Sequence, residues 1–418
     1  MDKERKFFGL SRTVFTLGIV SFFTDISSEM LVPIVPQFLK FIVGATTLQI
    51  GFIEGTAEAV ASLLRVWAGY LADKTGRPKL LTVIGYGLSA LSKPFYLGVL
   101  RWNWNWHSAF GIRFADRFGK GIRSAPRDVL LADASDESNR GKAFGFHRAM
   151  DTAGAALGPL VVIALVWLLA IHVSPTGPGE NRAIYKAVFL AAAIPAVLGW
   201  LVLVLFVSEK KHDEIAAKKP DLRFSALGGR FKIFLAIVTL FSIGNSSDAF
   251  LVLRATDPKG GVGMGFIQFL WVYAVFNILS AFVAARSGIL SDRIGRKPII
   301  VTGWLVFAAV YFAMARVTTP TQIWVWFVIY GIYYGLTEHM LRAFAIDLAP
   351  RDMRGTAVGA YFTFTGLALL PASVIAGYMW KNIGPSAPFY YGSAVALLSA
   401  LLMAALVKPH VPGQSGTQ

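Results

Sequence analysis

The tract Gly69-Tyr-Leu-Ala-Asp73-Lys-Thr-Gly76-Arg77 is repeated 219 residues later as Gly288-Ile-Leu-Ser-Asp292-Arg-Ile-Gly295-Arg296. Each copy ends a long apolar stretch of the chain. The same offset relates two further sets of residues, Ser27-Ser28-Glu29 to Ser246-Ser247-Asp248 and Gln49 to Gln268. Independent matches at one offset indicate a duplicated unit. In a membrane protein, a duplicated unit is typical of a transporter with its site between the two halves.

The composition is that of a membrane protein. The chain has 418 residues, of which 55% are hydrophobic and 15% are charged, and its mean hydropathy is +0.57. Several nearly uncharged tracts exceed the roughly 18 residues that cross about 30 Å of hydrocarbon. Only helices and closed barrels span lipid, and long apolar runs favour helices over short alternating strands. The expected fold class is therefore all-α and transmembrane.

Twelve runs predict twelve transmembrane helices, of which the fourth and fifth carry more charge than most. A basic polar stretch between the sixth and seventh spans divides the chain. We expect a six-helix bundle over 1–208, a cytoplasmic linker over 209–231, and a second six-helix bundle with a short tail over 232–418. The predicted spans are 13–38, 46–72, 80–100, 108–131, 143–171, 187–208, 232–253, 264–290, 299–317, 323–346, 355–380 and 388–407.

The net charge of +16 follows a membrane pattern rather than a nucleic-acid-binding one. Most Lys and Arg residues lie in short loops on the side of the N-terminus, so the positive-inside rule places both termini in the cytoplasm of a plasma or inner-membrane protein. No small-residue cleavage site follows the first apolar run, which is therefore interpreted as a span and not a signal peptide. The absence of cysteine excludes disulfides, thiolate catalysis and cysteine metal sites.

The repeated loop resembles the signature of the major facilitator superfamily. A further tract, Gly154-Ala-Ala-Leu-Gly158-Pro159, resembles the Gly-x-x-x-Gly-Pro motif common in proton-driven exporters of that superfamily. The resemblance covers the whole chain and implies two six-helix bundles, related by a pseudo-two-fold repeat, around a central cavity. It also implies that Asp73, Asp292 and their basic neighbours lock the cytoplasmic face in the outward-open state. The alternative is that these charges only set the topology.

Physical reasons for the motif residues are visible without the resemblance. A tight turn between two membrane helices needs glycine where φ is positive, and Gly76 and Gly295 meet that need. Gly154 and Gly158 allow close helix packing, and Pro159 loosens the helical hydrogen bonds. The motif has two interpretations: it contributes to the direction of transport, or it is a packing kink with no bearing on direction.

Ionisable residues at bilayer depth are each a hypothesis for a functional site, because they are costly unless paired or hydrated. In the first span, Asp25 and Glu29 are four residues apart and share a helix face. The fourth span places Arg113, Arg117 and Lys120 on one stripe, where they either line a wet substrate cavity or pair with carboxylates of spans one and two. The other candidates for the substrate cavity are Glu54, Asn245, Glu338 and His339.

Two carboxylates four residues apart in a low dielectric should not both remain ionised, which makes Asp25 or Glu29 a candidate proton carrier. Glu58 and Asp248 are further candidates. The alternative for Glu29 is a permanent salt bridge to Arg113 or Arg117. His339, beside Glu338, could relay protons or simply form a hydrogen bond in the helix packing. A separate set of residues, His147, Arg148 and Asp151, could extend the floor of the cavity or pair with Asp128, and we expect the pairing.

No phosphate-binding loop appears in the sequence, and the histidines lack zinc-site spacing, so a nucleotide-driven pump is not indicated. We expect no catalytic residues, metal or cofactor, and not an enzyme. The favoured function is proton-coupled efflux, by antiport, of a small anionic or amphipathic organic compound through alternating access. Proton-coupled uptake by symport, a lipid-translocating flippase-like activity and a non-transporting sensor are the alternatives. The expected partners of a monomeric chain are this substrate, protons and the lipid bilayer, without nucleic acid.

Overall fold

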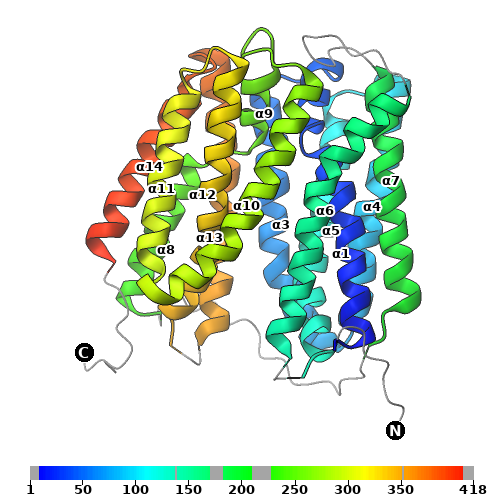
Figure 1. The fold of residues 1–418 in the computed structure, drawn as a ribbon, viewed down its shortest axis with the longest axis vertical. Coiled ribbons are helices and arrows are strands. Elements are labelled where there is room, and N and C mark those ends of the chain that lie inside the picture. Colours follow the sequence, from blue (N-terminus) through cyan, green and yellow to red (C-terminus); the bar gives the residue numbers. More distant parts are fainter. Residues whose placement is uncertain (1–8, 137–138, 170–181, 210–226, 351–352, 408–418) are drawn as a thin grey trace.

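A computed structural model of the protein describes residues 9–136, 139–169, 182–209, 227–350 and 353–407 (Figure 1). Within these ranges the regular structure is helical, and it forms twelve consecutive helical segments of membrane-spanning length. The first segment is interrupted, as is the seventh. The elements are α1 (Arg12–Leu31), α2 (Val35–Gln37), η1 (Phe38–Ile42), α3 (Thr47–Thr75), α4 (Pro78–Trp102), α5 (Trp106–Asp133), α6 (Arg140–Leu168), α7 (Arg182–Phe206), α8 (Gly229–Gly244), α9 (Ala249–Thr256), α10 (Phe266–Ile294), α11 (Arg296–Met314), α12 (Pro320–Asp347), α13 (Arg354–Asn382) and α14 (Ala387–Leu406).

Every predicted span coincides with one of these segments, so the predicted fold class is confirmed. In the described part of the chain, nine segments are long and apolar enough to cross a membrane. The other three, α3, α5 and α12, have the length but are less apolar. Apolar character rather than length therefore distinguishes these three helices, and all three contribute candidate site residues.

The helices form two halves with the same internal packing. In the N-half, α1 to α7, α1 packs against α6 and α7, and α5 packs against α3 and α4. In the C-half, α8 to α14, α8 packs against α13 and α14, and α12 packs against α10 and α11. Each contact in one half has its counterpart in the other, as a duplicated unit requires. The two halves lie side by side in Figure 1.

Two helix pairs join the halves, α3 with α13 and α6 with α10. The repeat relates these two pairs to each other. Glycine permits the closeness of the first pair, because a Cβ on Gly51 would lie 2.1 Å from the Ser373 carbonyl oxygen. A Cβ on Gly377 would likewise lie 2.3 Å from the carbonyl oxygen of Thr47. The Thr47 hydroxyl donates a hydrogen bond of 3.1 Å to the Gly377 carbonyl.

The ends of the molecule differ in how the halves meet. α1 begins and α14 ends at the same end, which we call the terminal end (Figure 1). At the opposite end α2 packs against α9, whose residues Ala249–Thr256 are all buried. Lys40 and Asp257 form an ion pair of 4.0 Å there between the two halves. The halves are therefore in contact at the opposite end.

The two repeated loops have the glycine conformation that the sequence predicts. Gly76 ends α3 with φ of +59°, and Gly295 ends α10 with φ of +83°. Residues with a Cβ rarely adopt this region of backbone space. The turn prediction is confirmed at both positions.

Candidate functional site

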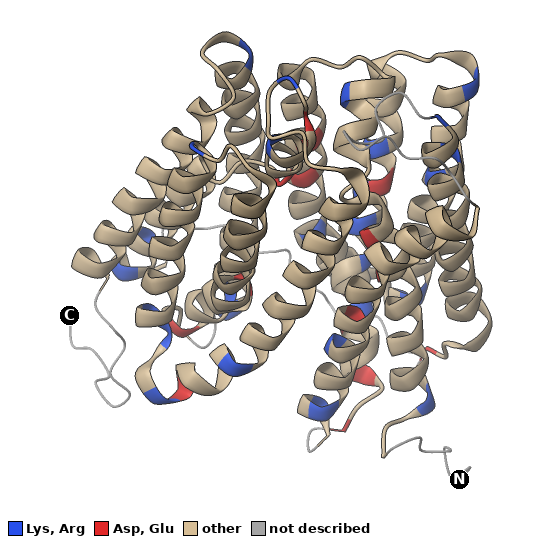
Figure 2. Cartoon of the chain, turned by 45° about the horizontal axis from the view of Figure 1, so that its top comes forward, with Lys and Arg blue, Asp and Glu red and all other residues tan. Residues whose placement is uncertain are grey.

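The charges of the N-half are largely paired between α3 and α5. Arg113 forms a bidentate contact with Glu54, with Nε 2.9 Å from Oε1 and Nη2 2.7 Å from Oε2. Both residues are buried, and the matched fork geometry offsets the cost of removing the two charges from water. Arg117 forms an ion pair of 3.0 Å with Glu58. For Arg113 and Arg117 the structure therefore shows the second alternative, ion pairing, with carboxylates of the second span. Figure 2 shows charged residues at several levels along the helices of the N-half.

A second buried cluster ties α4 to α5. Asp116 accepts a hydrogen bond from the Ser89 hydroxyl and lies 4.0 Å from the Lys93 ammonium. The Arg113 guanidinium lies 3.6 Å from the other carboxylate oxygen of Asp116. Lys120 differs from these cations, because its ammonium has no ion pair or hydrogen bond among the described residues.

Glu29 and Asp248, which the repeat places at equivalent positions, have similar surroundings. The Tyr273 hydroxyl donates a hydrogen bond of 2.8 Å to Glu29. The Tyr330 hydroxyl donates one of 2.7 Å to Asp248. Neither carboxylate has an ion pair within the described ranges, and the proposed permanent bridge from Glu29 to Arg113 or Arg117 is absent from the ion pairs those residues make.

The interruption of the seventh span positions Asp248. Helix α8 ends at Gly244 and α9 begins at Ala249, so Asn245–Asp248 form a break in which Asp248 precedes the first turn of α9. Asn245 donates a hydrogen bond of 3.4 Å to the Tyr333 hydroxyl. Discontinuous helices of this kind expose backbone and side-chain polar groups at membrane depth, where transporters bind substrates and ions.

The glycines of the fifth-span motif pack against the two carboxylates of α1. A Cβ on Gly154 would lie 3.1 Å from the Asp25 Cβ, and one on Gly158 would lie 2.7 Å from the Glu29 Cβ. The motif and the candidate proton carriers therefore belong to one helix contact, between α6 and α1. The small residues fix how closely Asp25 and Glu29 are held against the neighbouring helix.

Pro159 has a second consequence. Because proline has no N–H, the carbonyl of Ala155, four residues earlier, lacks its helical donor. Asn277 of α10 donates a hydrogen bond of 3.1 Å to that carbonyl. The bond joins the two halves at the level of the motif.

Three residues of this region, Tyr273, Asn277 and Tyr330, were missing from the sequence-based candidates. For two of them, the internal repeat provides a signal in the sequence. At the offset of 219 residues, Tyr273 corresponds to Glu54 and Asn277 to Glu58.

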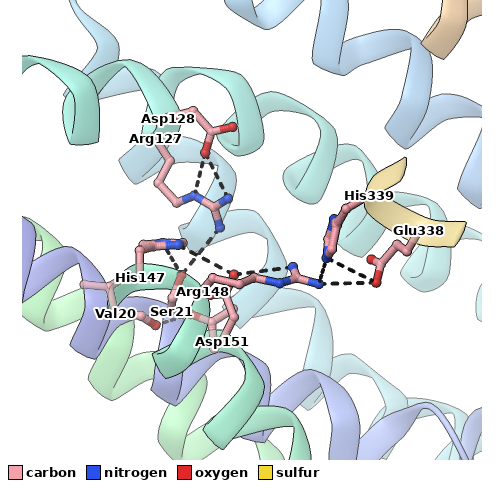
Figure 3. A network of polar contacts seen from close by, with 10 residues as sticks. Val20, Ser21, Arg127, Asp128, His147, Arg148, Asp151, Glu338 and His339 are labelled. Atoms are coloured by element: carbon pink, nitrogen blue, oxygen red, sulfur yellow. Dashed lines mark hydrogen bonds and ion pairs between the residues drawn. The ribbon is translucent and has the colours of Figure 1, made fainter. Parts of the chain in front are cut away.

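A chain of polar contacts runs across the terminal side of the site (Figure 3). Ser21 and His147 are joined by a hydrogen bond of 2.7 Å, and His147 lies 3.6 Å from Asp151. Arg127 pairs with Asp128 at 3.0 Å. The expected pairing of Asp128 with the residues that open the fifth span is therefore wrong, because the Asp128 carboxylate pairs with its sequence neighbour Arg127 instead.

Arg148 continues this chain into the C-half. Its Nη2 lies 3.2 Å from the Glu338 carboxylate and 2.5 Å from the His339 ring nitrogen (Figure 3). All three side chains are exposed although they lie on membrane-spanning helices. Exposed charges at such positions are stable when they face water rather than lipid. Glu338 and His339 thus lie on an exposed side of α12 that faces α6.

The repeated loops make different contacts. Arg296 pairs with Asp347 of α12 and donates a hydrogen bond of 2.8 Å to the Ala343 carbonyl. Asp73, Arg77 and Asp292 are exposed. Among the described residues, no ion pair or hydrogen bond joins either loop to the other half, so the lock between halves stays a prediction.

Comparisons with known proteins agree with this architecture. The model of the Major Facilitator Superfamily matches residues 17–370 and 259–418. An uncharacterized MFS-type transporter of Methanocaldococcus jannaschii is 36% identical over 402 residues, which cover 94% of each chain.

Two solved structures share the fold. A POT peptide transporter has a TM-score of 0.77 and 14% identity, covering 96% of this chain and 95% of that one. A D-xylose-proton symporter has a TM-score of 0.73 and 16% identity, covering 95% of this chain and 98% of that one. The chain therefore belongs to the major facilitator superfamily and is a multi-pass membrane transporter.

Proposed function

We propose that the protein is a proton-coupled secondary transporter that exports a small anionic or amphipathic organic compound. In this proposal both termini lie in the cytoplasm, and the halves 1–208 and 232–418 move about a central site. The observation that supports this proposal most is that Glu29 and Asp248, at equivalent positions of the repeat, have similar surroundings. Each accepts a hydrogen bond from a tyrosine hydroxyl and has no cationic partner within the described residues. Export as the direction is supported by the Gly154–Pro159 motif.

Glu29 is suited to couple protonation to movement because its hydroxyl donor comes from the other half. Tyr273 lies on α10, whereas Glu29 lies on α1. An ionised carboxylate accepts a stronger hydrogen bond than a protonated one does. Proton binding would therefore weaken one contact between the halves and change the balance between inward-open and outward-open states.

Asp248 has a different part in this scheme. Its donor, Tyr330, belongs to the same half, so its protonation changes no direct contact between the halves. We assign the conformational step to Glu29 and a supporting role in proton or substrate binding to Asp248. Asp25, held against Gly154, is a second proton site on the same face of α1.

The test is transport in proteoliposomes under an imposed pH gradient, with a compound identified by thermal-shift screening of the purified protein. Glu29→Gln should abolish uphill flux and retain counterflow, because the amide cannot carry a proton but fills the same space. Tyr273→Phe removes the hydroxyl and leaves the carboxyl able to titrate, so it should retain proton binding at Glu29 but weaken its coupling to uphill flux. Unchanged uphill flux in Glu29→Gln would remove that residue from the mechanism.

The same experiment separates the alternatives. Proton movement opposite to the substrate supports antiport, and movement with the substrate supports symport. Movement of labelled lipid between leaflets without proton flux supports lipid translocation.

A further inference from the structure

Arg65, Lys120 and Arg342 are cations of the membrane-spanning helices that form no ion pair among the described residues. Arg65 lies on α3, Lys120 on α5 and Arg342 on α12. In the described part of the chain, none of their side chains forms an ion pair or a hydrogen bond, and the buried Nε of Arg65 has no acceptor. Arg113 and Arg117, on the same helix as Lys120, form ion pairs with Glu54 and Glu58. The three free cations are therefore not needed to neutralise the carboxylates of α3.

Two of these cations meet at one aromatic ring. The guanidinium carbon of Arg65 lies 4.6 Å from the centroid of the Phe362 ring, and that of Arg342 lies 5.8 Å from the same centroid. Arg65 belongs to the N-half and Arg342 to the C-half. Like charges from both halves thus lie within reach of one small bound molecule.

Lys120 lies close to the segment of α3 that carries Arg65. Its neighbour Gly121 packs against α3, where a Cβ would be 2.7 Å from the Leu64 Cβ, one residue before Arg65. Since Glu58 is already paired with Arg117, the local balance of charge is positive.

We propose that Arg65 and Arg342, with Lys120 beside them, bind the substrate through a carboxylate or phosphate group. This inference rests on the proposed transport function and narrows its substrate to an organic anion. An anion between the two guanidinium groups removes the repulsion between the halves and draws them together around it. Its release restores the repulsion. Binding thereby favours one conformational state, as alternating access requires.

Binding to the purified full chain in an uncharged detergent tests the proposal. Benzoate, benzamide and benzamidinium have nearly the same shape but different charge, and inorganic phosphate provides a second anion. At constant ionic strength, benzoate or phosphate should raise the unfolding temperature, and benzamide and benzamidinium should not. Arg65→Gln and Arg342→Gln should each weaken anion affinity at least about tenfold, the loss typical of a hydrogen bond to a charged group.

Arg286→Gln is the matched control. Arg286 also lies over a phenyl ring, that of Phe282 at 4.9 Å, but both residues are on α10 and no residue of the other half takes part. This variant should keep the wild-type anion affinity. Arg65→Lys should keep the preference for anions, which separates a lost charge from a misfolded protein, and the unfolding temperature without ligand checks the fold of each variant.

Several results would overturn the proposal. Equal shifts with all three benzene derivatives, or no shift with either anion, would show that the site does not select negative charge. An equal loss of affinity in Arg286→Gln would show an unspecific charge effect. A shift with phosphatidylglycerol but not with benzoate or phosphate would assign the cations to a lipid headgroup instead of a substrate. None of these results bears on proton coupling by Glu29, because the assay has no proton gradient.

Discussion

The two halves share a backbone arrangement but place different chemistry at equivalent positions. In the N-half, ion pairs between α3 and α5 fill the space, with Glu54 bound to Arg113 and Glu58 bound to Arg117. The equivalent positions of α10 and α12 are neutral, being Tyr273, Phe327, Asn277 and Gly331. A duplicated unit therefore preserves which helices touch, whereas the side chains between them can change from charged to neutral.

Aromatic rings replace ion pairs in the core of the C-half. Phe241 stacks on Trp304 with centroids 4.4 Å apart, and Phe276 stacks on Tyr330 at 5.5 Å. Such contacts stabilise packing without burying charge. The exchange also frees polar groups of α10, since Tyr273 and Asn277 bond to α1 and α6 of the other half instead of to α12. The asymmetry between halves thus supplies the polar contacts of their interface.

The largest effect that this comparison predicts is on stability. Arg113→Met leaves Glu54 buried without its partner and should lower the free energy of unfolding by about 4 kcal/mol. The double variant with Glu54→Leu should recover most of that loss, because it resembles the neutral C-half. Phe327→Leu, at the position equivalent to Arg113, should cost only about 1 kcal/mol. Denaturant unfolding in detergent measures all three, and a double variant as unstable as Arg113→Met would contradict the charge argument.

The sequence predicts the fold far better than it predicts which side chains pair between helices. Long apolar runs indicate most of the spans, and positive φ at Gly76 and Gly295 follows from the turn chemistry. Spacing along one helix shows that Glu54 and Glu58 share a face, but it does not show which helix packs there. Asp128 was assigned to the wrong partner for the same reason. Tyrosine makes the site harder to predict from sequence, because Tyr273 lies in an apolar stretch and is easily taken for a residue of the hydrophobic core.

A smaller effect is expected where the halves differ in glycine. Gly154 and Gly158 correspond, 214 residues on, to the buried alanines Ala368 and Ala372. Gly158→Ala makes α6 like its counterpart, but the new Cβ would lie 2.7 Å from the Glu29 Cβ, and we expect a loss of about 2 kcal/mol from overpacking.

Gly145→Ala on the same helix is the control for this substitution. No atom lies within 4 Å of the Cβ that it would add. Alanine's higher helix propensity should make it neutral or slightly stabilising in the same unfolding measurement. Equal losses at Gly145 and Gly158 would mean that the α1 contact does not depend on glycine.

The smallest effect concerns the bond that crosses between halves at Pro159. Asn277→Ala removes the donor to the Ala155 carbonyl and should cost about 1 kcal/mol. Pro159→Ala restores an N–H that can satisfy this carbonyl within α6, so in that background the loss of Asn277 should cost less. A double-mutant cycle on unfolding measures the difference, expected at about 0.5 kcal/mol or more. If the two substitutions are additive, the proline does not create the acceptor and the link between α6 and α10 has another origin.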